Sequence, residues 1–275
     1  MNKHFIIIPL LALTNFCFAQ KQDDEPYSYK DDLTFAWQHD SSILKFTAQN
    51  QTLAPIEVIF YSRANDKELK SFLLKPSDSI VFLNYTGKKV DSVFRQEFSD
   101  SVRLAYFIGH KSVIEPDLDF QYRLPFKEGK KYEVSQSFNG KASHNSTRSK
   151  YAIDFQLNVG EPVYAARGGL VIKVIDWFTK QGGRELINAA NKILILHDDG
   201  TIASYVHLDY HGSFVKEGDI VAMGDKIGIS GVTGFTRGPH LHFVVRKERD
   251  IAIPVYFKGY ANQKLKQGKR YKIKD

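Results

Sequence analysis

The sequence predicts an all-β protein with two domains. Short runs rich in β-branched and aromatic residues recur between turn residues along most of the 275-residue chain. The composition is 43% hydrophobic and 25% charged, which is ordinary for a globular protein and excludes a disordered chain. In the second half, only residues 182–192 lack a strand pattern, and they are predicted to form a helical or loop-like insertion between two strands.

The first nineteen residues have the features of a secretory signal. Lys3 precedes an almost uncharged run over residues 5–18, and small residues lead up to a cleavage point after Ala19. The run of 14 residues is shorter than the about 20 needed to span a membrane. We therefore expect a signal peptide at 1–19 and an exported protein, periplasmic, extracellular or at the cell envelope, without a transmembrane segment after its removal.

Cys17 is the only cysteine, and it would be removed with the signal. The mature chain then has no disulfide and no thiolate to offer a metal. Any metal site must be built from histidine and carboxylate side chains.

Charge is unevenly distributed between the two halves. Residues 20–130 carry 15 Lys/Arg and 17 Asp/Glu, whereas residues 131–275 carry 22 and 14. The basic second half would attract polyanions, but the same excess of positive charge is also explained if it only keeps the protein in solution. Charge alone is weak support for nucleic-acid binding, and we expect no nucleic-acid partner.

Residues 20–125 are predicted to form an accessory β-sandwich. Strand-like runs at 43–48, 56–61, 79–83 and 102–108 are separated by polar turns, a spacing typical of an immunoglobulin-like sandwich. No cluster of reactive side chains occurs among these residues. A linker rich in charge and proline, roughly 115–131, is expected to follow.

The second domain is predicted over residues 131–257, followed by a basic C-terminal tail at 258–275. Asp199-Gly200 after an apolar run is a strong hairpin signal. Gly-Asp pairs at Gly218-Asp219 and Gly224-Asp225 mark two further tight turns.

Histidine and aspartate side chains gather in strand-like segments of this second domain. Because side chains alternate across a strand, His240 and His242 share one face while Leu241 and Phe243 occupy the other. By the same rule Asp154 lies opposite its apolar neighbours, and Tyr205 shares a face with His207. His144 precedes Asp154 along the chain. If these strands form one sheet, their polar faces make one groove.

A single histidine is more often a packed or surface residue than a metal ligand, and a His-x-His pair alone is weak. The occurrence of His or Asp on the polar face of three strand-like segments is more specific evidence for a metal site than any one of these residues alone. Other templates fit badly, since the chain has neither a His-Glu-x-x-His helix nor a Gly-x-Ser-x-Gly elbow.

Residues from about Ser137 to Arg246 resemble the catalytic domain of the lysostaphin-like zinc endopeptidases. The segment between His144 and Asp154 is longer than in many members. The matching segments, in order, are His144, Ala152-Ile153-Asp154-Phe155, Gly160 to Gly169, Tyr205-Val206-His207-Leu208, Val215 to Asp219, Ser230 to Gly234 and Gly238 to Phe243.

This resemblance implies an antiparallel β-sheet peptidase domain with Zn²⁺ bound by His144, Asp154 and His242. It implies that His207 and His240 are catalytic, without deciding which moves the proton and which stabilises the oxyanion. Two imidazoles and one carboxylate leave zinc an open fourth position, as a catalytic site requires. Tyr205 is expected either to line the substrate groove or to brace it.

The function that follows is a secreted zinc endopeptidase hydrolysing peptide bonds, D,D-crosslinks in particular, of bacterial peptidoglycan. The alternative is a non-catalytic peptidoglycan- or amidase-binding module of the same fold, which would be expected to lack ligands that this chain retains. A lipoyl-type carrier shares the Gly-Asp turns but has no use for five converging His and Asp residues. The accessory domain is a spacer, a docking module or a lid over the groove.

Overall fold

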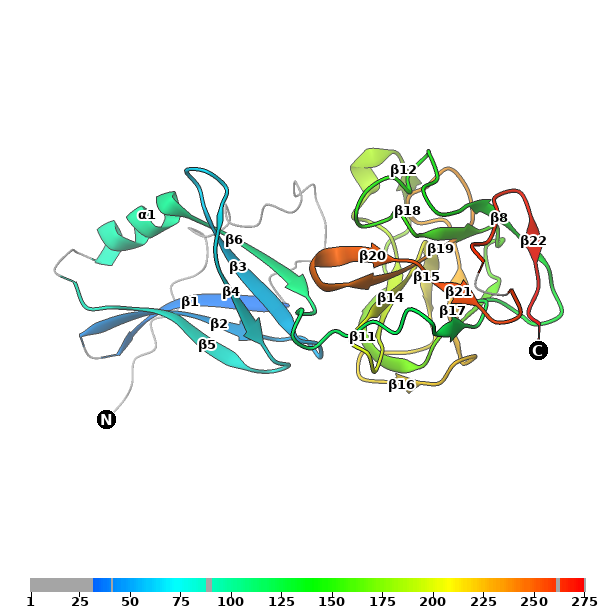
Figure 1. The fold of residues 1–275 in the computed structure, drawn as a ribbon. Helices are drawn as coiled ribbons and strands as arrows, with labels where there is room; N and C mark the ends of the chain where they lie inside the picture. Colours follow the sequence, from blue (N-terminus) through cyan, green and yellow to red (C-terminus); the bar gives the residue numbers. More distant parts are fainter. Residues whose placement is uncertain (1–31, 41, 88–90, 261–262, 275) are drawn as a thin grey trace. The chain divides into compact units, whose positions relative to one another are not determined.

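The computed structural model describes residues 32–40, 42–87, 91–260 and 263–274, which divide into two compact units at Phe107 and Ile108 (Figure 1). The predicted signal peptide lies outside the described residues. Within them, no helix is long and apolar enough to cross a membrane.

The first unit contains two antiparallel sheets of three strands, β1-β2-β5 and β4-β3-β6. They share one core, in which Phe46 from the first sheet packs on Phe60 from the second. One helix, α1 (Asp91–Ser101), was not predicted, and it buries no residue. The strands are β1 (Leu33–Asp40), β2 (Ile43–Asn50), β3 (Ile56–Ser62), β4 (Glu68–Leu74), β5 (Ser79–Tyr85) and β6 (Val102–Ile108).

A β-sandwich therefore accounts for this unit. A constant-type immunoglobulin domain has seven strands, whereas six are described here. The immunoglobulin-like detail stays a prediction.

The second unit is built on a nine-stranded sheet in the order β16-β11-β13-β14-β19-β9-β8-β22, with β20 paired to β19. The predicted hairpin at Asp199-Gly200 joins β13 and β14, with Gly200 at φ +79. The strands are β8 (Tyr132–Gln136), β9 (Ile153–Phe155), β11 (Gly169–Ile175), β13 (Lys192–Leu196), β14 (Ile202–Val206), β16 (Ile220–Val221), β19 (Leu241–Lys247), β20 (Ile251–Ile253) and β22 (Arg270–Tyr271).

Smaller sheets complete this unit. β10 (Pro162–Tyr164), β17 (Lys226–Ser230) and β15 (Leu208–Ser213) form a three-stranded antiparallel sheet. Two short parallel pairs join β12 (Gln181–Gly182) to β18 (Gly234–Phe235) and β7 (Gln121–Tyr122) to β21 (Tyr256–Phe257). Instead of a longer helix, the insertion at 182–192 holds a single 3-10 turn, Arg184–Leu186.

The expected linker at 115–131 is instead part of the second unit. Tyr122, Leu124 and Phe126 are at most 2% exposed and belong to its main core. Apolar residues between the charged ones pair with β21 and pack inside, so the boundary lies at 107/108 instead of near 125–131.

The expected basic tail at 258–275 also packs on this unit. Leu265 is 1% exposed within the core, and β22 pairs with β8. The high lysine content hid this strand, because the few apolar residues that pack on the core, Tyr260, Leu265, Tyr271 and Ile273, are scattered among exposed lysines.

Candidate metal centre

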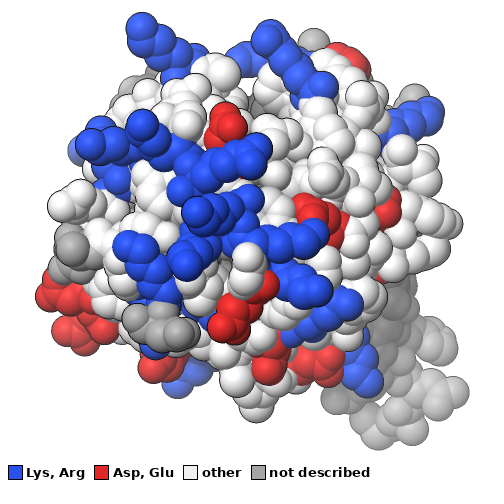
Figure 2. Space-filling view, turned by 90° about the vertical axis from the view of Figure 1, so that its right-hand side faces the viewer, with Lys and Arg blue, Asp and Glu red and all other residues white. Residues whose placement is uncertain are grey.

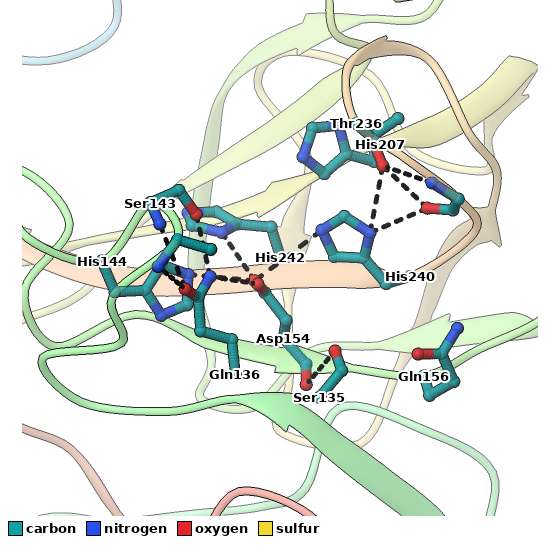
Figure 3. Close-up of polar contacts among 12 residues, drawn as sticks. Ser135, Gln136, Ser143, His144, Asp154, Gln156, His207, Thr236, His240 and His242 are labelled. Atoms are coloured by element: carbon teal, nitrogen blue, oxygen red, sulfur yellow. Dashed lines mark hydrogen bonds and ion pairs between the residues drawn. The ribbon is translucent and has the colours of Figure 1, made fainter.

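The centre of the site lies on two neighbouring strands, β9 and β19. His242 is paired directly with Asp154, and its Nδ1 lies 2.8 Å from Asp154 Oδ1 (Figure 3). Leu241, Phe243 and Phe155 point to the opposite face, where all three are fully buried. The alternation predicted from the sequence therefore holds at both strands, and it separates the polar groove from the core.

His144 reaches the same point from the loop that joins β8 to β9. It is fully buried, and its Nδ1 donates to the backbone oxygen of Ser137 at 3.1 Å. With the Nδ1 proton used in this way, a neutral ring presents the lone pair of Nε2 to Asp154 Oδ1, 3.2 Å away. His144 Nε2 is buried and has no hydrogen-bond partner among the described residues.

A buried lone pair facing a carboxylate oxygen is unfavourable unless a proton or a metal ion lies between or beside the two. The candidate ligand atoms of His144, Asp154 and His242 all lie within 4.8 Å of one another. Tetrahedral zinc with bonds of about 2.0–2.2 Å keeps its ligand atoms roughly 3.3 Å apart. Two imidazole nitrogens and one carboxylate oxygen at these separations fit zinc, and they leave one coordination position open.

Electrostatics favour the metal-binding protonation states of Asp154 and His242. Burial would raise the pKa of Asp154, but its contacts with His144 and His242 outweigh burial and hold the pKa well below the usual range. Burial lowers the pKa of His242, so its ring is neutral at neutral pH. A carboxylate and neutral imidazoles are the forms that coordinate zinc.

His207 and His240 stand together beside this cluster, with ring centroids 4.6 Å apart. His207 Nδ1 donates to the backbone oxygen of Thr233 at 2.7 Å, and His240 Nδ1 donates to that of Gly238 at 2.9 Å. A carbonyl oxygen only accepts, so each neutral ring keeps its proton on Nδ1 and has a free lone pair on Nε2.

The two rings differ in their surroundings. Burial, together with the neighbouring His240 and His242, lowers the pKa of His207 to about 3. His240 is more exposed, and its Nε2 lies 3.8 Å from Asp154 Oδ1. Both rings therefore have an Nε2 that can take up or share a proton next to the candidate metal position.

Gln136 is a site residue that the sequence reasoning missed. Its Nε2 donates to Asp154 Oδ2 at 2.9 Å and to Ser143 Oγ at 2.8 Å (Figure 3). Its Oε1 accepts from the backbone N–H groups of Ala142 and Ser143. One amide thus joins the carboxylate to the loop that carries His144.

A β-bulge aims Gln136 at the site. Val134 pairs with Phe155 and Gln136 with Asp154, so β8 has one extra residue, at Ser135, between these pairs. A Cβ on Gly140 would lie 2.3 Å from Gln136 Cγ, so glycine is needed there for the side chain to fit. Simple alternation along 132–136 cannot reveal this residue, because the bulge shifts it by one position.

The prediction that Tyr205 contacts substrate is wrong. Tyr205 is fully buried on the core face, packs against Phe243 and accepts a hydrogen bond from the backbone N–H of Ala166 at 2.8 Å. It does not share a face with His207, because β14 ends at Val206 and His207 adopts φ +66. Tyr205 braces the sheet beneath the site.

Comparison with known families finds one match, in the second unit. The profile of Peptidase family M23 matches residues 148–254. This range includes Asp154, His207, His240 and His242 but begins four residues after His144. The position of His144 in the cluster therefore rests on the geometry of its loop.

Curated relatives match less than half of the chain. Peptidoglycan DD-endopeptidase ShyB of Vibrio cholerae is 35% identical over 116 residues, which are 41% of this chain and 25% of that protein. Lysostaphin of Staphylococcus staphylolyticus is 38% identical over 94 residues, 34% of this chain and 18% of the relative. The matches span about a third or less of the length of these relatives.

Among solved structures, the catalytic domain of lysostaphin from Staphylococcus simulans is 30% identical. The match covers 46% of this chain and 87% of that one, with a TM-score of 0.34.

Proposed function

Because residues 148–254 form a domain of peptidase family M23, we propose that this chain is a zinc-dependent endopeptidase that hydrolyses peptide bonds of bacterial peptidoglycan. The observation that carries the proposal is the convergence of His144 Nε2, Asp154 Oδ1 and His242 Nδ1, with two further imidazoles beside them. Relatives named lysostaphin and peptidoglycan DD-endopeptidase support the substrate class. D,D-crosslinks between stem peptides are the proposed bonds.

In this proposal His144, Asp154 and His242 hold the ion, and His207 and His240 are the catalytic residues. A bound zinc supplies a Lewis acid that acidifies a water molecule and polarises the scissile carbonyl. The free Nε2 of one histidine accepts the proton of the attacking water and delivers it to the leaving amine. The other ring, once its Nε2 is protonated from solvent, can donate a hydrogen bond to the oxyanion of the tetrahedral intermediate.

The hydrogen bonds of the two rings suit these roles. Each Nδ1 proton is fixed on a backbone oxygen, so each ring presents the Nε2 side to substrate and becomes a donor there only after protonation. When one ring carries the transferred proton, its Nδ1–H···O contact also stabilises the positive charge. A module that only binds peptidoglycan would not require this arrangement.

Export is part of the proposal. A signal peptide at residues 1–19 would bring the mature chain to the periplasm or the cell envelope, where peptidoglycan lies.

The test is digestion of purified peptidoglycan with the mature chain, followed by mass analysis of the fragments. We expect crosslinked dimers to be converted into monomers by addition of one water per bond, with no loss when His211, an exposed histidine, is replaced by alanine. Binding to peptidoglycan without any new fragment would identify the chain as a binding module instead.

A further inference from the structure

A basic face lies on the second unit next to the proposed active site. It is formed by the C-terminal segment 258–274 and the turn at 127–131 that leads into β8. Figure 2 shows this side, where Lys and Arg outnumber Asp and Glu across the middle of the view. The exposed cations are Lys127, Lys130, Lys131, Lys258, Lys264, Lys266, Lys269, Arg270, Lys272 and Lys274.

The charge is concentrated there. Residues 131–275 carry 22 Lys/Arg and 14 Asp/Glu, whereas residues 131–257 alone carry 15 and 13. Residues 258–274 contribute seven Lys/Arg and no Asp/Glu. A surface that is basic only for solubility would have its charge dispersed, so the excess in one segment calls for a local explanation.

These cations sit on a fixed scaffold. β22 pairs with β8, Leu265 is buried, and the ring of Tyr260 packs edge-on against that of Tyr271. The Tyr260 hydroxyl also bonds to the backbone of Lys272. The positions of the charges are therefore set by the sheet and its buried side chains.

Among the described residues of the unit, ion pairs neutralise few of these charges. Lys130 pairs with Glu161 at 2.8 Å, and Arg270 lies 3.9 Å from Glu133. Lys274 donates to a backbone oxygen, which leaves its charge in place. At one edge the surface is hollowed by about 290 Å³, lined by Arg123, Lys258 and Lys274 together with Glu128.

The face and the proposed catalytic site are connected by β8. Lys131 precedes this strand and Gln136, which bonds to Asp154, ends it, so about 3.3 Å per residue places the edge of the face roughly 16 Å from Asp154. Leu265 in the C-terminal segment accepts a hydrogen bond from Ser137 Oγ, and Ser137 in turn holds the His144 ring. A polymer that follows the surface over β8 would contact both.

From this placement we infer that the basic face binds the carboxylate-bearing peptidoglycan strand whose crosslink is being cut, and so holds the substrate polymer across the active site. The inference rests on the proposed function. Free carboxylates of stem peptides are scattered along the polymer, and lysine ammonium groups on long flexible side chains can reach them as point charges without a fixed geometry. Six of the seven cations in 258–274 are lysines.

Other partners fit this face less well. Single-stranded nucleic acid is bound by stacking of bases on exposed aromatic rings, whereas Tyr260 and Tyr271 are half-buried and pack on each other. A membrane-inserting surface needs exposed apolar side chains. None of the exposed large hydrophobic residues of the described chain lies within 127–131 or the described part of 258–274.

The test compares two triple variants of the mature chain with equal loss of charge. Lys266, Lys269 and Lys272 are changed to glutamine on the face, and Lys67, Lys75 and Lys216, exposed lysines elsewhere, are changed to glutamine as the control. Binding to purified peptidoglycan sacculi is measured by co-sedimentation at 4 °C over a series of salt concentrations. Turnover is measured on sacculi and on a small soluble crosslinked peptide.

We expect the face variant to bind sacculi about tenfold more weakly at low salt, with a shallower dependence on salt, because exposed charges act within about 10 Å at 0.1 M salt. KM on sacculi should rise by a similar factor with kcat unchanged, and turnover of the small peptide should not change. The control variant should behave like the parent chain. Thermal unfolding of all three proteins checks that the fold is retained.

Equal weakening in both variants, or in neither, would overturn the inference. So would tighter binding to single-stranded DNA or to phosphatidylglycerol vesicles than to sacculi. If the face variant loses binding but the parent chain cuts nothing, the basic face stands and the proposed hydrolysis fails. If the parent chain cuts crosslinks and the face variant binds sacculi normally, the proposed hydrolysis stands and the role of the basic face fails.

Discussion

At the scale of single residues, replacing His240 should impair catalysis without impairing metal binding. Its Nε2 faces the groove, while its Nδ1 is held by the backbone oxygen of Gly238. In His240→Ala we expect zinc to be retained and the rate of peptidoglycan cleavage to fall at least about a hundredfold, as expected for loss of an acid–base group. Metal analysis and turnover of the same sample check both parts, and loss of zinc would place His240 among the ligands.

Gln136 is expected to position Asp154 and His144 without touching substrate. Gln136→Met keeps the length of the side chain but removes its bonds to Asp154 and Ser143. Zinc affinity should weaken about 10- to 100-fold, the usual effect of losing a group that orients a metal ligand. Competition with a chelator measures it, and Gln267→Met, at an exposed position, should have no effect. Unchanged affinity in Gln136→Met would reduce the residue to a packing role.

The site residues differ in how well the sequence predicts them. Strand alternation places His240, His242 and Asp154 on one polar face, and the structure agrees. It fails at Tyr205, because the left-handed conformation of His207 resets the alternation just after β14. It also fails at Gln136, because the bulge at Ser135 in the same strand, β8, turns Gln136 to the face that simple alternation does not predict.

At the scale of secondary-structure elements, the pattern of apolar and polar residues in the sequence predicts a strand reliably where the strand has one apolar face. The hairpin of β13 and β14 was predicted from its apolar run and Asp199-Gly200. Helix α1 was missed because none of its residues is fully buried and its apolar stripe consists of only two rings one turn apart, Phe94 and Phe98, which pack on Trp37. β22 is two residues long and lies among lysines, and only its pairing with β8 makes it a strand.

The C-terminal segment should contribute to stability as part of the sheet. Leu265 is 1% exposed, so Leu265→Ala should lower the free energy of unfolding by about 2–5 kcal/mol through loss of buried contacts and the cavity left behind. Urea unfolding of the mature chain measures this. Lys264→Ala, next to it and exposed, should stay within about 0.5 kcal/mol of the parent. Two equally stable variants would mean that the segment is a solvated tail.

At the scale of the whole molecule, the division at 107/108 determines which fragment can fold. Residues 108–275 contain Tyr122, Leu124 and Phe126, whereas a fragment beginning at 131 lacks these three buried side chains. Each large buried residue contributes about 2–5 kcal/mol, and a domain is stable by only about 5–15 kcal/mol. We expect 108–275 to unfold cooperatively and 131–275 to be unfolded or aggregated.

The same fragment tests the role of the first unit. Higher turnover of peptidoglycan by 108–275 than by the mature chain would identify the first unit as a lid, equal turnover as a spacer and lower turnover as a docking module. A stable, active 131–275 would contradict the assignment of residues 108–130 to the core of the second unit.

The central claim, that His144, Asp154 and His242 together hold a catalytic zinc, is tested most directly by anomalous X-ray scattering at the zinc absorption edge from crystals of the mature chain grown with zinc. We predict one strong peak about 2.0–2.2 Å from His144 Nε2, Asp154 Oδ1 and His242 Nδ1, with the fourth position facing His207 and His240. The peak should vanish in crystals of His242→Ala. A peak bound by His207 or His240 in place of one of these three residues, or no peak at the cluster, would contradict the account.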